Sequence, residues 1–581
     1  MIGLFAVTEA GRRAANELAA FLGPDAVVPD GPIRPALQRL WPQLGSAVFF
    51  LATGATVRLV APLLRDKQTD PGVVCVDEAR QFAVALAGGH AGGANALAQR
   101  VAEVFGCTPV ITTASDATGQ TPLDELVELL DASVDGDLAA CGVAVLNGEP
   151  VTLSNPLGFP LPALPENVTA HGHDSAWTIV VDDRLPEGPP KERVLRLVPR
   201  TLVVGVGSAR GVPTTAVTSA MSKLEVQGGL DLRAVKAFAT IDLKADEQGI
   251  LDAVEDWSFW HDSTTTPLLT YPAGVLAYVE VPNPSDVVQA EVGTPSVAEA
   301  AALHGARQLG GGADVQLAAE KFKGDNVTVA AARIMPRGRL AVVGLGPGAA
   351  DLRTPRAEAE LRRASIVVGL DQYVDQIRHL LRPGTDIRIS GLGDEEARAR
   401  EAVQLASAGA SVALIGSGDA GVYAMASPAL EQADALVEFV GVPGVTAALA
   451  ASSLLGAPLG HDHALISLSD LHTPWPAIER RVRAAAEGDF VVCFYNPRSQ
   501  ERDWQLGKAL EILREHRPSS TPVGAVRQAS RDGQRVWCVP IDEFDAAGVD
   551  MLTTVVVGSS QSKFVAGRMV TPRGYQWMPS R

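Results

Sequence analysis

The chain is poor in cysteine and in positive charge, and each shortage argues against a class of protein. Five cysteines are scattered over 581 residues without a CxxC pair, which argues against a disulfide framework and against thiolate-bound zinc. We therefore expect no metal centre. The formal net charge of −18 excludes a nucleic-acid surface, since that would need a basic stripe. An anionic small substrate remains possible if local arginine and lysine clusters hold it.

The chain also has little that favours a membrane. Its first residues, MIGLFAVTEAGRRAANEL, lack a basic start followed by a long apolar run, and they predict strand, turn and helix instead of a signal peptide. Residues 439–460 carry no charge and are long enough to span a bilayer. They contain Pro443, Pro458 and several glycines, however, so we expect a strand, a turn and an alanine-rich helix. The predicted location is the cytoplasm.

The length and the recurring strand-to-helix pattern predict a multidomain α/β protein. A chain of 581 residues is too long for one core, and about three to five domains are expected. We expect α/β domains at 1–120 and 199–335, separated by a smaller middle domain at 121–198. Within these we predict strands at SAVFFLATGA, GVAVLN and WTIVVDD, a hairpin around Glu78, and a helix at GANALAQRVAEVFG.

After Arg339 several apolar strands end in small or hydrogen-bonding residues. LAVVGLGPG lacks the third glycine of GxGxxG and alone is no more than a tight turn. VALIGSGDAGVY, VEFVGVPGVTAALAA, DFVVCFYNPRS and LTTVVVGSS repeat the pattern of a strand that ends in such residues. Because the carboxyl ends of strands in an α/β sheet share one edge, they predict one crevice for a polar, adenosine-sized ligand.

This segment resembles the class III tetrapyrrole methyltransferases, and within them the precorrin-3B or cobalt-factor III C-17 methyltransferases. The resemblance rests on GLGPG, SGDAGVY, VPGVTAALAA, LGAPLGHD, ISLSDLHTPW, FYNPRS and VDMLTTVVVG, in order over 339–581. It implies two α/β subdomains, 339–450 and 451–581, with S-adenosylmethionine (SAM) bound between them. It also implies a tetrapyrrole substrate, methylation at C-17 with ring contraction, and a homodimer.

The resemblance also implies roles for single residues. Ser417, Gly418 and Asp419 would meet the methionine or ribose end of SAM. The adenosine side would be lined by Val422, Thr446, Ala447, Tyr495 and Asn496, while the GPG turn (Gly346, Pro347, Gly348) would shape the substrate trough. The chain departs from the family pattern at Ala349 and Ala420.

Methyl transfer from a sulfonium needs positioning and water exclusion more than an acid–base pair. The ring contraction could use a proton carrier, for which Asp470 is the first candidate and Asp462 the second; each could equally be a turn or cap acid. His461 and His463 form an HxH without a third ligand, so no metal site is predicted.

The first 335 residues carry two polar groupings of their own. Arg58, Arg65 and Lys67 lie close together in the sequence, and on a helix Arg58 and Arg65 would share a face. Such a patch could bind carboxylates, or it could be a solvated helix face. His90 lies among four glycines in AGGHAGGAN, a turn that suggests close ligand approach. ATIDLKADE gathers Asp242, Lys244 and Glu247. Ser296 with Glu299 three residues later predicts a helix capping box.

This part resembles the cobalt-precorrin-5A hydrolase family. RLVAPLLRDKQTDPGVVCVDE, LAGGHAGGANALA and TPVITTASD match the N-terminal domain of that family, and VGVGSARG, ATIDLKADE, VPNPS, VGTPSVAEAAAL and NVTVAAAR match its C-terminal domain. The resemblance implies opening of a corrinoid δ-lactone with release of acetaldehyde, on an N-terminal α/β architecture distinct from the α/β-hydrolase fold. Such chemistry needs donors and a base, for which we expect Lys244 and His90 as donors and Glu247 or Asp242 as base.

Together the two resemblances predict a bifunctional enzyme of cobalamin synthesis that binds corrinoids and no nucleic acid or membrane. One alternative is an active methyltransferase whose N-terminal half binds a corrinoid without catalysis. Another is a methyltransferase of a different substrate, against which ISLSDLHTPW argues.

Overall fold

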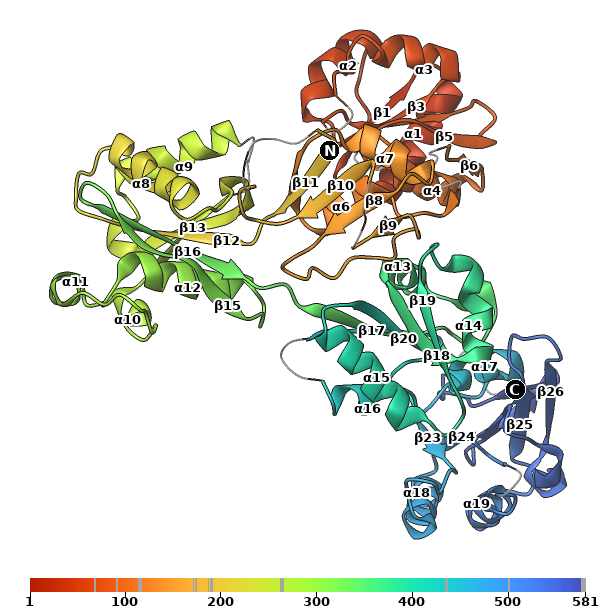
Figure 1. Cartoon of the computed structure of the whole chain (residues 1–581). Coiled ribbons are helices and arrows are strands. Elements are labelled where there is room, and N and C mark those ends of the chain that lie inside the picture. Colours follow the sequence, from red (N-terminus) through yellow and green to blue (C-terminus); the bar gives the residue numbers. More distant parts are fainter. Residues whose placement is uncertain are drawn as a thin grey trace. The chain divides into compact units, whose positions relative to one another are not determined.

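The computed structural model describes the whole chain except residues 67–68, 90–91, 113–117, 171, 173–174, 187, 189–191, 262–265, 434–436, 500–501 and 576–581. The chain forms two compact units. One comprises Met1–Phe159, Leu164–Met335 and Arg382–Gly384, and the other comprises Pro160–Ala163, Pro336–Leu381 and Thr385–Arg581. We describe each unit by itself (Figure 1). Lys67 and His90, two of the predicted site residues, lie outside the described residues.

The first unit begins with a six-stranded sheet in the order β2-β1-β3-β4-β5-β6. The strands β1 to β4 are parallel, and β5 runs antiparallel to β4, as the hairpin around Glu78 predicts. The elements are β1 (Ile2–Ala6), α1 (Glu9–Leu22), β2 (Ala26–Val27), α2 (Ile33–Leu40), β3 (Ser46–Phe50), α3 (Thr53–Val60), β4 (Gly72–Val76), β5 (Phe82–Ala87), α4 (Ala94–Phe105) and β6 (Thr108–Val110).

A second sheet follows in the order β7-β11-β10-β8-β9. Its elements are α6 (Leu123–Leu129), β7 (Ala132–Asp135), α7 (Leu138–Leu146), β8 (Val151–Ser154), β9 (Val168–Thr169), β10 (Trp177–Val181) and β11 (Val194–Pro199). The strand predicted at GVAVLN is wrong, because these residues lie in α7. Asp137 caps that helix by accepting a hydrogen bond from the N–H of Ala140 at 2.8 Å.

The third sheet, in the order β14-β13-β12-β16-β15, positions the site of the first unit. Strand β12 lies parallel to β13 and antiparallel to β16. The elements are β12 (Leu202–Ser208), α8 (Thr214–Val226), β13 (Val235–Ile241), α9 (Gln248–Trp260), β14 (Leu268–Tyr271), α10 (Ala273–Leu276), α11 (Asp286–Val292), α12 (Val297–Leu309), β15 (Val315–Lys323) and β16 (Val327–Ile334). Apolar cores lie on both faces: α8 and α9 cover one and α12 the other.

The second unit opens with five parallel strands in the order β19-β18-β20-β17-β21. The elements are β17 (Gly338–Gly344), α13 (Pro355–Arg363), β18 (Ile366–Leu370), α14 (Asp371–Ile377), β19 (Asp386–Ser390), α15 (Glu395–Ser407), β20 (Ser411–Gly416), α16 (Ala426–Leu430), β21 (Val437–Val442) and α17 (Ala447–Leu455). Residues 439–460 thus form the predicted strand, turn and helix. No helix among the described residues is long and apolar enough to cross a bilayer.

The rest of the second unit is a mixed sheet in the order β23-β24-β27-β25-β26, with a small three-stranded sheet beside it. The mixed sheet contains β23 (His463–Ser467), β24 (Val491–Tyr495), β25 (Pro522–Arg527), β26 (Arg535–Pro540) and β27 (Thr553–Val557), and it packs α18 (Trp475–Glu487) and α19 (Gln505–Arg514). The small sheet is made by β22 (Gly456–Ala457), β28 (Lys563–Val565) and β29 (Arg568–Val570). Each large sheet therefore belongs to an α/β domain.

Candidate active sites

The carboxyl ends of β17, β20 and β21 meet at one point of the parallel sheet. The backbone of Gly346 pairs with that of Gly418: the N–H of Gly346 donates to the carbonyl of Gly418 at 3.0 Å, and the N–H of Gly418 donates back at 2.8 Å. A Cβ added to Gly344 would lie 2.7 Å from the carbonyl oxygen of Gly418 and 2.9 Å from the nitrogen of Gly444. Glycine is required there because backbone atoms of Gly418, Ala420 and Gly444 occupy the space of a side chain.

Asp419 organises this junction through its carboxylate. One oxygen accepts the N–H of Gly421 at 2.8 Å, and the other accepts the N–H of Gly444 at 3.0 Å. The N–H of Val422 donates to the Asp419 carbonyl at 3.3 Å. The carboxylate therefore ties the turn after β20 to the turn after β21, and its remaining lone pairs are available to a ligand hydroxyl.

The phenol of Tyr495, at the end of β24, is fixed at the start of α17. Its oxygen lies 2.6 Å from the hydroxyl of Thr446 and accepts the N–H of Ala448 at 3.0 Å. Ala447, the first residue of α17, lies between these two contacts. Burial is the largest effect on this phenol and raises its pKa. The ring of Tyr423 lies 5.2 Å from that of Tyr495, and its hydroxyl donates to the carbonyl of Leu465 at 2.7 Å.

Asn496 follows Tyr495 in a left-handed conformation, with φ of 49°. Asparagine tolerates this region better than most residues, and here it turns the chain at the strand end. The Nδ2 of Asn496 donates to the Oγ of Ser467 at 3.2 Å. Ser467 pairs with Tyr495 across parallel β23 and β24. The carboxyl ends of these two strands therefore stand together, as the sequence pattern predicts.

Arg531 is a residue of this site that sequence reasoning missed. It lies in the loop between β25 and β26, and its Nε donates to the carbonyl of Pro347 at 2.5 Å. Its Nη2 donates to the Oγ of Ser417 at 2.8 Å. The side chain also occupies the space that a Cβ on Gly348 would need. The only signal in the sequence is an arginine inside the loop QASRDGQ, which is too common a pattern to single out.

The two proposed proton carriers lie at different ends of β23. Asp470 follows the carboxyl end, where one oxygen accepts a hydrogen bond from Gln505 at 3.0 Å and the other lies 4.0 Å from Arg502. Asp462 precedes the amino end, is 78% exposed in its side chain, and lies 3.2 Å from His461. Because Tyr495 stands at the carboxyl end, Asp470 is the better placed of the two.

A second polar group lies at the carboxyl ends of β12 and β13. The carboxylate of Glu247 accepts the N–H of Gly211 at 2.9 Å, and its other oxygen lies 3.5 Å from the Nζ of Lys244 and 3.8 Å from Arg210. Lys244 and Glu247 are both buried, whereas Asp242 is exposed. The structure thus joins Lys244 and Glu247 and leaves Asp242 outside their contact.

The capping box predicted at Ser296 and Glu299 is wrong. Ser296 occupies the position before α12, but its side chain caps no N–H of that helix. Glu299 instead accepts hydrogen bonds from the Nδ2 of Asn283 at 2.8 Å and from the N–H of Lys321 at 3.1 Å. Long-range partners in the sheet replace the local bonds that the sequence spacing suggests.

The predicted arginine face of the N-terminal domain does not form as a helical face. Helix α3 ends at Val60, so Arg58 lies on the helix and Arg65 lies beyond it. Arg58 donates to the carbonyl of Gly54 at 3.1 Å, and the N–H of Arg65 donates to Asp70 at 2.8 Å. Both residues are exposed, and their role in binding a substrate stays a prediction.

Gly88 and Gly92 pack closely against the backbone of Gly72. A Cβ on Gly92 would lie 2.6 Å from the nitrogen of Gly72, and one on Gly88 would lie 3.0 Å from the Cα of Gly72. The Oγ of Ser46 donates to the carbonyl of Gly92 at 3.2 Å. The close approach that the glycines indicate is therefore made by the start of β4.

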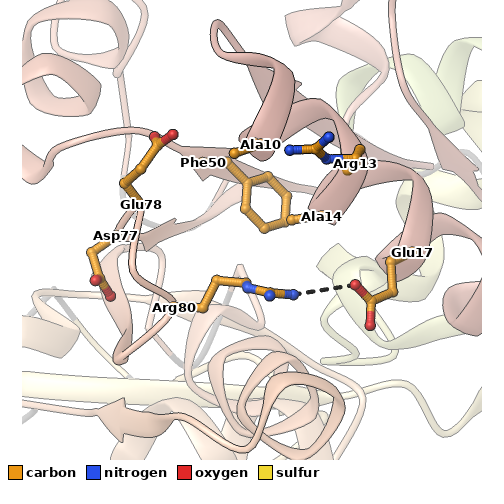
Figure 2. Close-up of a pocket in the computed structure, with 9 residues that line it drawn as sticks. Ala10, Arg13, Ala14, Glu17, Phe50, Asp77, Glu78 and Arg80 are labelled. Carbon is orange, nitrogen blue, oxygen red and sulfur yellow. Dashed lines mark hydrogen bonds and ion pairs between the residues drawn. The ribbon is translucent and has the colours of Figure 1, made fainter.

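A pocket of ≈ 300 Å³ lies at the opposite edge of this sheet, beside α1 and the β4–β5 turn (Figure 2). Two of its charged groups form an ion pair, since Arg80 contacts Glu17 at 3.2 Å, and Glu78 accepts a hydrogen bond from the hydroxyl of Thr8 at 2.8 Å. Asp77 accepts the backbone N–H groups of its own turn. No predicted site residue lines this pocket. In the described part of the chain no three His, Cys, Asp or Glu side chains are grouped as a metal site would need, and all five thiols are free.

Different family models match the parts of the chain that carry the two polar sites. Residues 339–545 match the model of the tetrapyrrole (corrin/porphyrin) methylases. Residues 35–116 match the N-terminal model of cobalamin synthesis G, and residues 202–332 match its C-terminal model. The chain is thus a fusion of cobalamin synthesis G domains with a tetrapyrrole methylase.

The relatives agree with the C-terminal match. The "probable cobalt-factor III C(17)-methyltransferase" of Salmonella typhimurium is 45% identical over 41% of this chain and 99% of its own length. The "precorrin-3B C(17)-methyltransferase" of a Sinorhizobium species is 43% identical over 41% of this chain and 97% of its own length. The solved structure of the methyltransferase CobJ is 38% identical over 40% of this chain and all of that chain, with a TM-score of 0.38. Through residues 339–581 the chain belongs to the tetrapyrrole methylase family.

Proposed function

We propose that the chain is a bifunctional enzyme of cobalamin biosynthesis. Its second unit methylates C-17 of precorrin-3B or cobalt-factor III with SAM and contracts the ring. Its first unit opens the lactone of cobalt-precorrin-5A and releases acetaldehyde. The observation that carries the proposal is the joining, in one chain, of both cobalamin synthesis G matches to a methylase 45% identical to a C-17 methyltransferase relative.

The strand ends of the second unit fit SAM. The carboxyl ends of β17, β20 and β21 carry Gly344, Gly346, Gly416, Gly418 and Gly444, and peptide groups without side chains can meet a ligand directly. Ser417, Gly418 and Asp419 would hold the methionine and ribose, and Val422, Thr446, Ala447, Tyr495 and Asn496 would line the adenine side. When bound, SAM supplies the electrophilic methyl group.

The chain's own part in methyl transfer is positioning. Tyr495 is held by Thr446 and by the N–H of Ala448, and burial raises its pKa, so it acts as a neutral wall and not as a base. The GPG turn, Gly346 to Gly348, lies under the side chain of Arg531. Precorrins carry many carboxylates, and a guanidinium at this turn would pair with one of them.

The ring contraction needs a proton carrier beside the substrate. We assign this role to Asp470, because it follows the strand end next to that of Tyr495 and its carboxylate is partly exposed (38% of the side chain). Its contacts with Gln505 and Arg502 orient the carboxylate. Asp462 is the weaker candidate, since it stands at the other end of β23.

The test is an anaerobic assay of the full chain by mass spectrometry of the products. With SAM, precorrin-3B or cobalt-factor III should gain one methyl group, and comparison of the two substrates tells whether cobalt is required. With cobalt-precorrin-5A the chain should release acetaldehyde. No methylated product would refute the first activity, and no acetaldehyde would refute the second.

A second candidate function for the first unit is corrinoid binding without catalysis. It is favoured by one observation: both oxygens of Glu247, an expected base, are engaged by Gly211, Lys244 and Arg210. Tight binding of cobalt-precorrin-5A with no release of acetaldehyde would establish it. The substrate contacts of Arg58, Arg65 and Lys67, and a donor role for His90 or Lys244, belong to either candidate and are tested by substituting each with alanine.

Two further points rest on the family alone. We propose a homodimer, which sedimentation of the full chain would test, and a cytoplasmic enzyme, which fractionation of the host cell would test. Both follow from the resemblance to tetrapyrrole methylases.

A further inference from the structure

Three residues at the start of α12 carry buried side-chain oxygens without a hydrogen-bond partner. These oxygens are the Oγ1 of Thr294, the Oγ of Ser296 and the Oε2 of Glu299, none of which has a hydrogen-bond partner among the described residues. Thr294 and Glu299 are 0% exposed and Ser296 is 2% exposed. Buried polar groups are nearly always paired, so three such atoms in one short segment call for a ligand or a reactant. We call these residues the α12 polar cluster.

The packing of α12 on β12 places the cluster at the carboxyl end of the strand. A Cβ on Gly207, the second-last residue of β12, would lie 3.1 Å from the Cβ of Val297, the first residue of α12. Gly205 has no room for a Cβ at all, because the carbonyl of Ala298 occupies that space. Two glycines in β12 thus let the helix start lie directly against the strand end.

The cluster offers donors and one acceptor side by side. The first turn of a helix has backbone N–H groups without partners inside the helix, and Ser296 leaves those of α12 uncapped. These N–H groups and the hydroxyls can donate. Glu299 can accept, because Asn283 and Lys321 hold its Oε1 and leave its Oε2 free.

Hydrolysis of an ester by water needs this combination. A carboxylate removes a proton from water, and donors stabilise the negative charge that develops on the carbonyl oxygen. Glu247 fits the first role poorly, because Gly211, Lys244 and Arg210 engage its oxygens. Glu299 has one oxygen committed to orientation and one available for chemistry.

We propose that the α12 polar cluster is the water-activating site of the lactone hydrolysis, with Glu299 as its general base. The inference rests on the proposed hydrolase function and moves the base from Glu247 to Glu299. The hydroxyl of Ser296 and the N–H groups of the first turn of α12 hold the carbonyl oxygen. The hydroxyl of Thr294 completes the set of hydrogen-bonding groups around it.

The reaction balances without any co-reactant besides water. The oxygen of water forms a bond to the lactone carbonyl carbon while a proton passes to the Oε2 of Glu299, and the carbonyl π electrons move onto the carbonyl oxygen. The adduct collapses and breaks the bond between that carbon and the ring oxygen, which takes the proton back from Glu299. Ring opening gives a carboxylic acid and an alcohol. The alcohol carbon then leaves as acetaldehyde: its O–H proton is lost, a C=O bond forms, the bond from this carbon to the macrocycle breaks, and the macrocycle carbon takes up a proton, so no external oxidant or reductant is needed.

The substrate would approach over the loop that follows β12. Ala209, Arg210 and Gly211 are exposed, and the side chain of Arg210 is 60% exposed although it contacts Asp246 at 2.6 Å. A guanidinium at this entrance suits a ligand that carries several carboxylates.

The test compares variants of the full chain in acetaldehyde release from cobalt-precorrin-5A. We expect Glu299→Gln to lower kcat by about 10²–10³-fold, the usual contribution of a general base. Ser296→Ala should lower it by about 10-fold or more through the loss of a donor. Ser285→Ala is the matched control: Ser285 precedes α11 and does cap it, through the N–H of Val288 at 3.5 Å, so kcat should stay at the wild-type value.

Two further measurements separate catalysis from folding. Methyl transfer by the second unit should be unchanged in each variant, and formate should restore part of the activity of Glu299→Ala by supplying a carboxylate. Wild-type kcat in Glu299→Gln or in Ser296→Ala, or no rescue by formate, would overturn the proposal. If the unsubstituted chain itself releases no acetaldehyde, the proposed hydrolase function fails instead, and the two failures are thereby distinguished.

Discussion

The Nη2 of Arg531 donates a hydrogen bond to the Oγ of Ser417 at 2.8 Å, which links two loops more than 100 residues apart in the sequence. The same guanidinium reaches the carbonyl of Pro347 through its Nε. One side chain from the β25–β26 loop thus fixes the turns after β17 and β20, where we expect SAM and the tetrapyrrole to meet. Because a rigid site of this kind is already ordered, it loses less conformational entropy when the ligands bind.

Replacing Arg531 should therefore impair methyl transfer more than it impairs folding. We expect Arg531→Ala to lower kcat/KM for the tetrapyrrole by about 10–100-fold, since each hydrogen bond to a charged group contributes about 1.5–3 kcal/mol. Arg531→Lys should recover little, because an ammonium cannot make both contacts in one plane. Steady-state methylation assays measure this effect.

The control for that experiment is Arg535→Ala. Arg535 lies at the end of the same loop, and its guanidinium stands over the ring of Trp537 at 5.9 Å. Its removal should leave kcat/KM within about 2-fold, because a surface substitution usually changes stability by about 0.5 kcal/mol or less. Equal losses in the two variants would mean that loop stability, and not the contact with Ser417, explains the effect.

Tyr495→Phe should weaken SAM binding while the fold persists. The change removes the contacts with Thr446 and with the N–H of Ala448, and a neutral hydrogen bond contributes about 0.5–1.5 kcal/mol. We expect the Kd of SAM to rise about 3–10-fold by isothermal titration calorimetry. Tyr271→Phe, in the other unit, should leave this Kd unchanged; an unchanged Kd in Tyr495→Phe would remove Tyr495 from the SAM site.

In an alkaline titration the buried tyrosines should ionise at a higher pH than free tyrosine. Burial is the main cause that raises the pKa of Tyr271, Tyr373, Tyr423 and Tyr495 above the ordinary value of 10.0. At pH 10 the folded chain should therefore show less phenolate absorbance near 295 nm than the same chain in urea. Equal absorbance in the two states would contradict the burial of these phenols.

The same shifts give the stability a direction with pH. An unfolded phenol ionises near pH 10, whereas these folded phenols stay neutral to higher pH, so ionisation favours the unfolded state. The stabilisation is complete below pH 10 and is lost as the pH rises through the folded pKa values. The urea midpoint should fall as the pH rises above the unfolded value of about 10, and a constant midpoint would contradict this direction.

Arg517→Lys should destabilise the second unit strongly. The buried guanidinium donates to the carbonyls of Gly558, Ala486, His516, Ala485 and Phe490 and contacts Asp489 at 3.0 Å. Lysine offers fewer donors without the planar fork, so several buried carbonyls lose their partner, at about 1–3 kcal/mol each. We expect the free energy of unfolding in urea to fall by about 3 kcal/mol or more.

Arg483→Lys is the matched control for that loss. Arg483 is 42% exposed in its side chain and contacts Glu479 and Glu515 at 3.4 and 3.3 Å. Such surface pairs contribute about 0–1 kcal/mol, so this variant should unfold close to the wild-type urea concentration. Similar behaviour of the two variants would show that the carbonyl contacts of Arg517 contribute little.

The sequence predicts the strand ends of β17, β20, β21 and β24 because each carries a local mark. The prediction is wrong for LTTVVVGSS, since β27 runs antiparallel to β24 and its carboxyl end lies at the opposite end of that sheet. Glycine at 346 and 418 suits the positive φ of these residues (78° and 69°), and Asn496 tolerates a positive φ as well. Arg531 carries no such mark, since its partners are distant in sequence and an arginine in a loop is ordinary. Where residues distant in sequence complete a site, the sequence predicts only the residues that carry a local pattern.

The errors have the same origin. GVAVLN is a short apolar run, and such a run does not distinguish a strand from a buried helix; the cap supplied by Asp137 decides for the helix. The spacing of Ser296 and Glu299 suits a capping box, yet Asn283 and Lys321 take the carboxylate instead. In both cases a partner outside the pattern determines the outcome.

The glycines of the methylase crevice also limit how the enzyme could be re-engineered. A side chain at Gly344 would collide with backbone that no rotamer change can move, and the same holds for Gly444. At Gly416 and Gly441, by contrast, an added Cβ meets nothing within 4 Å. Libraries that seek to accept larger sulfonium analogues, or to exclude SAM in favour of them, should therefore vary Gly416 and Gly441 and leave Gly344 and Gly444 alone.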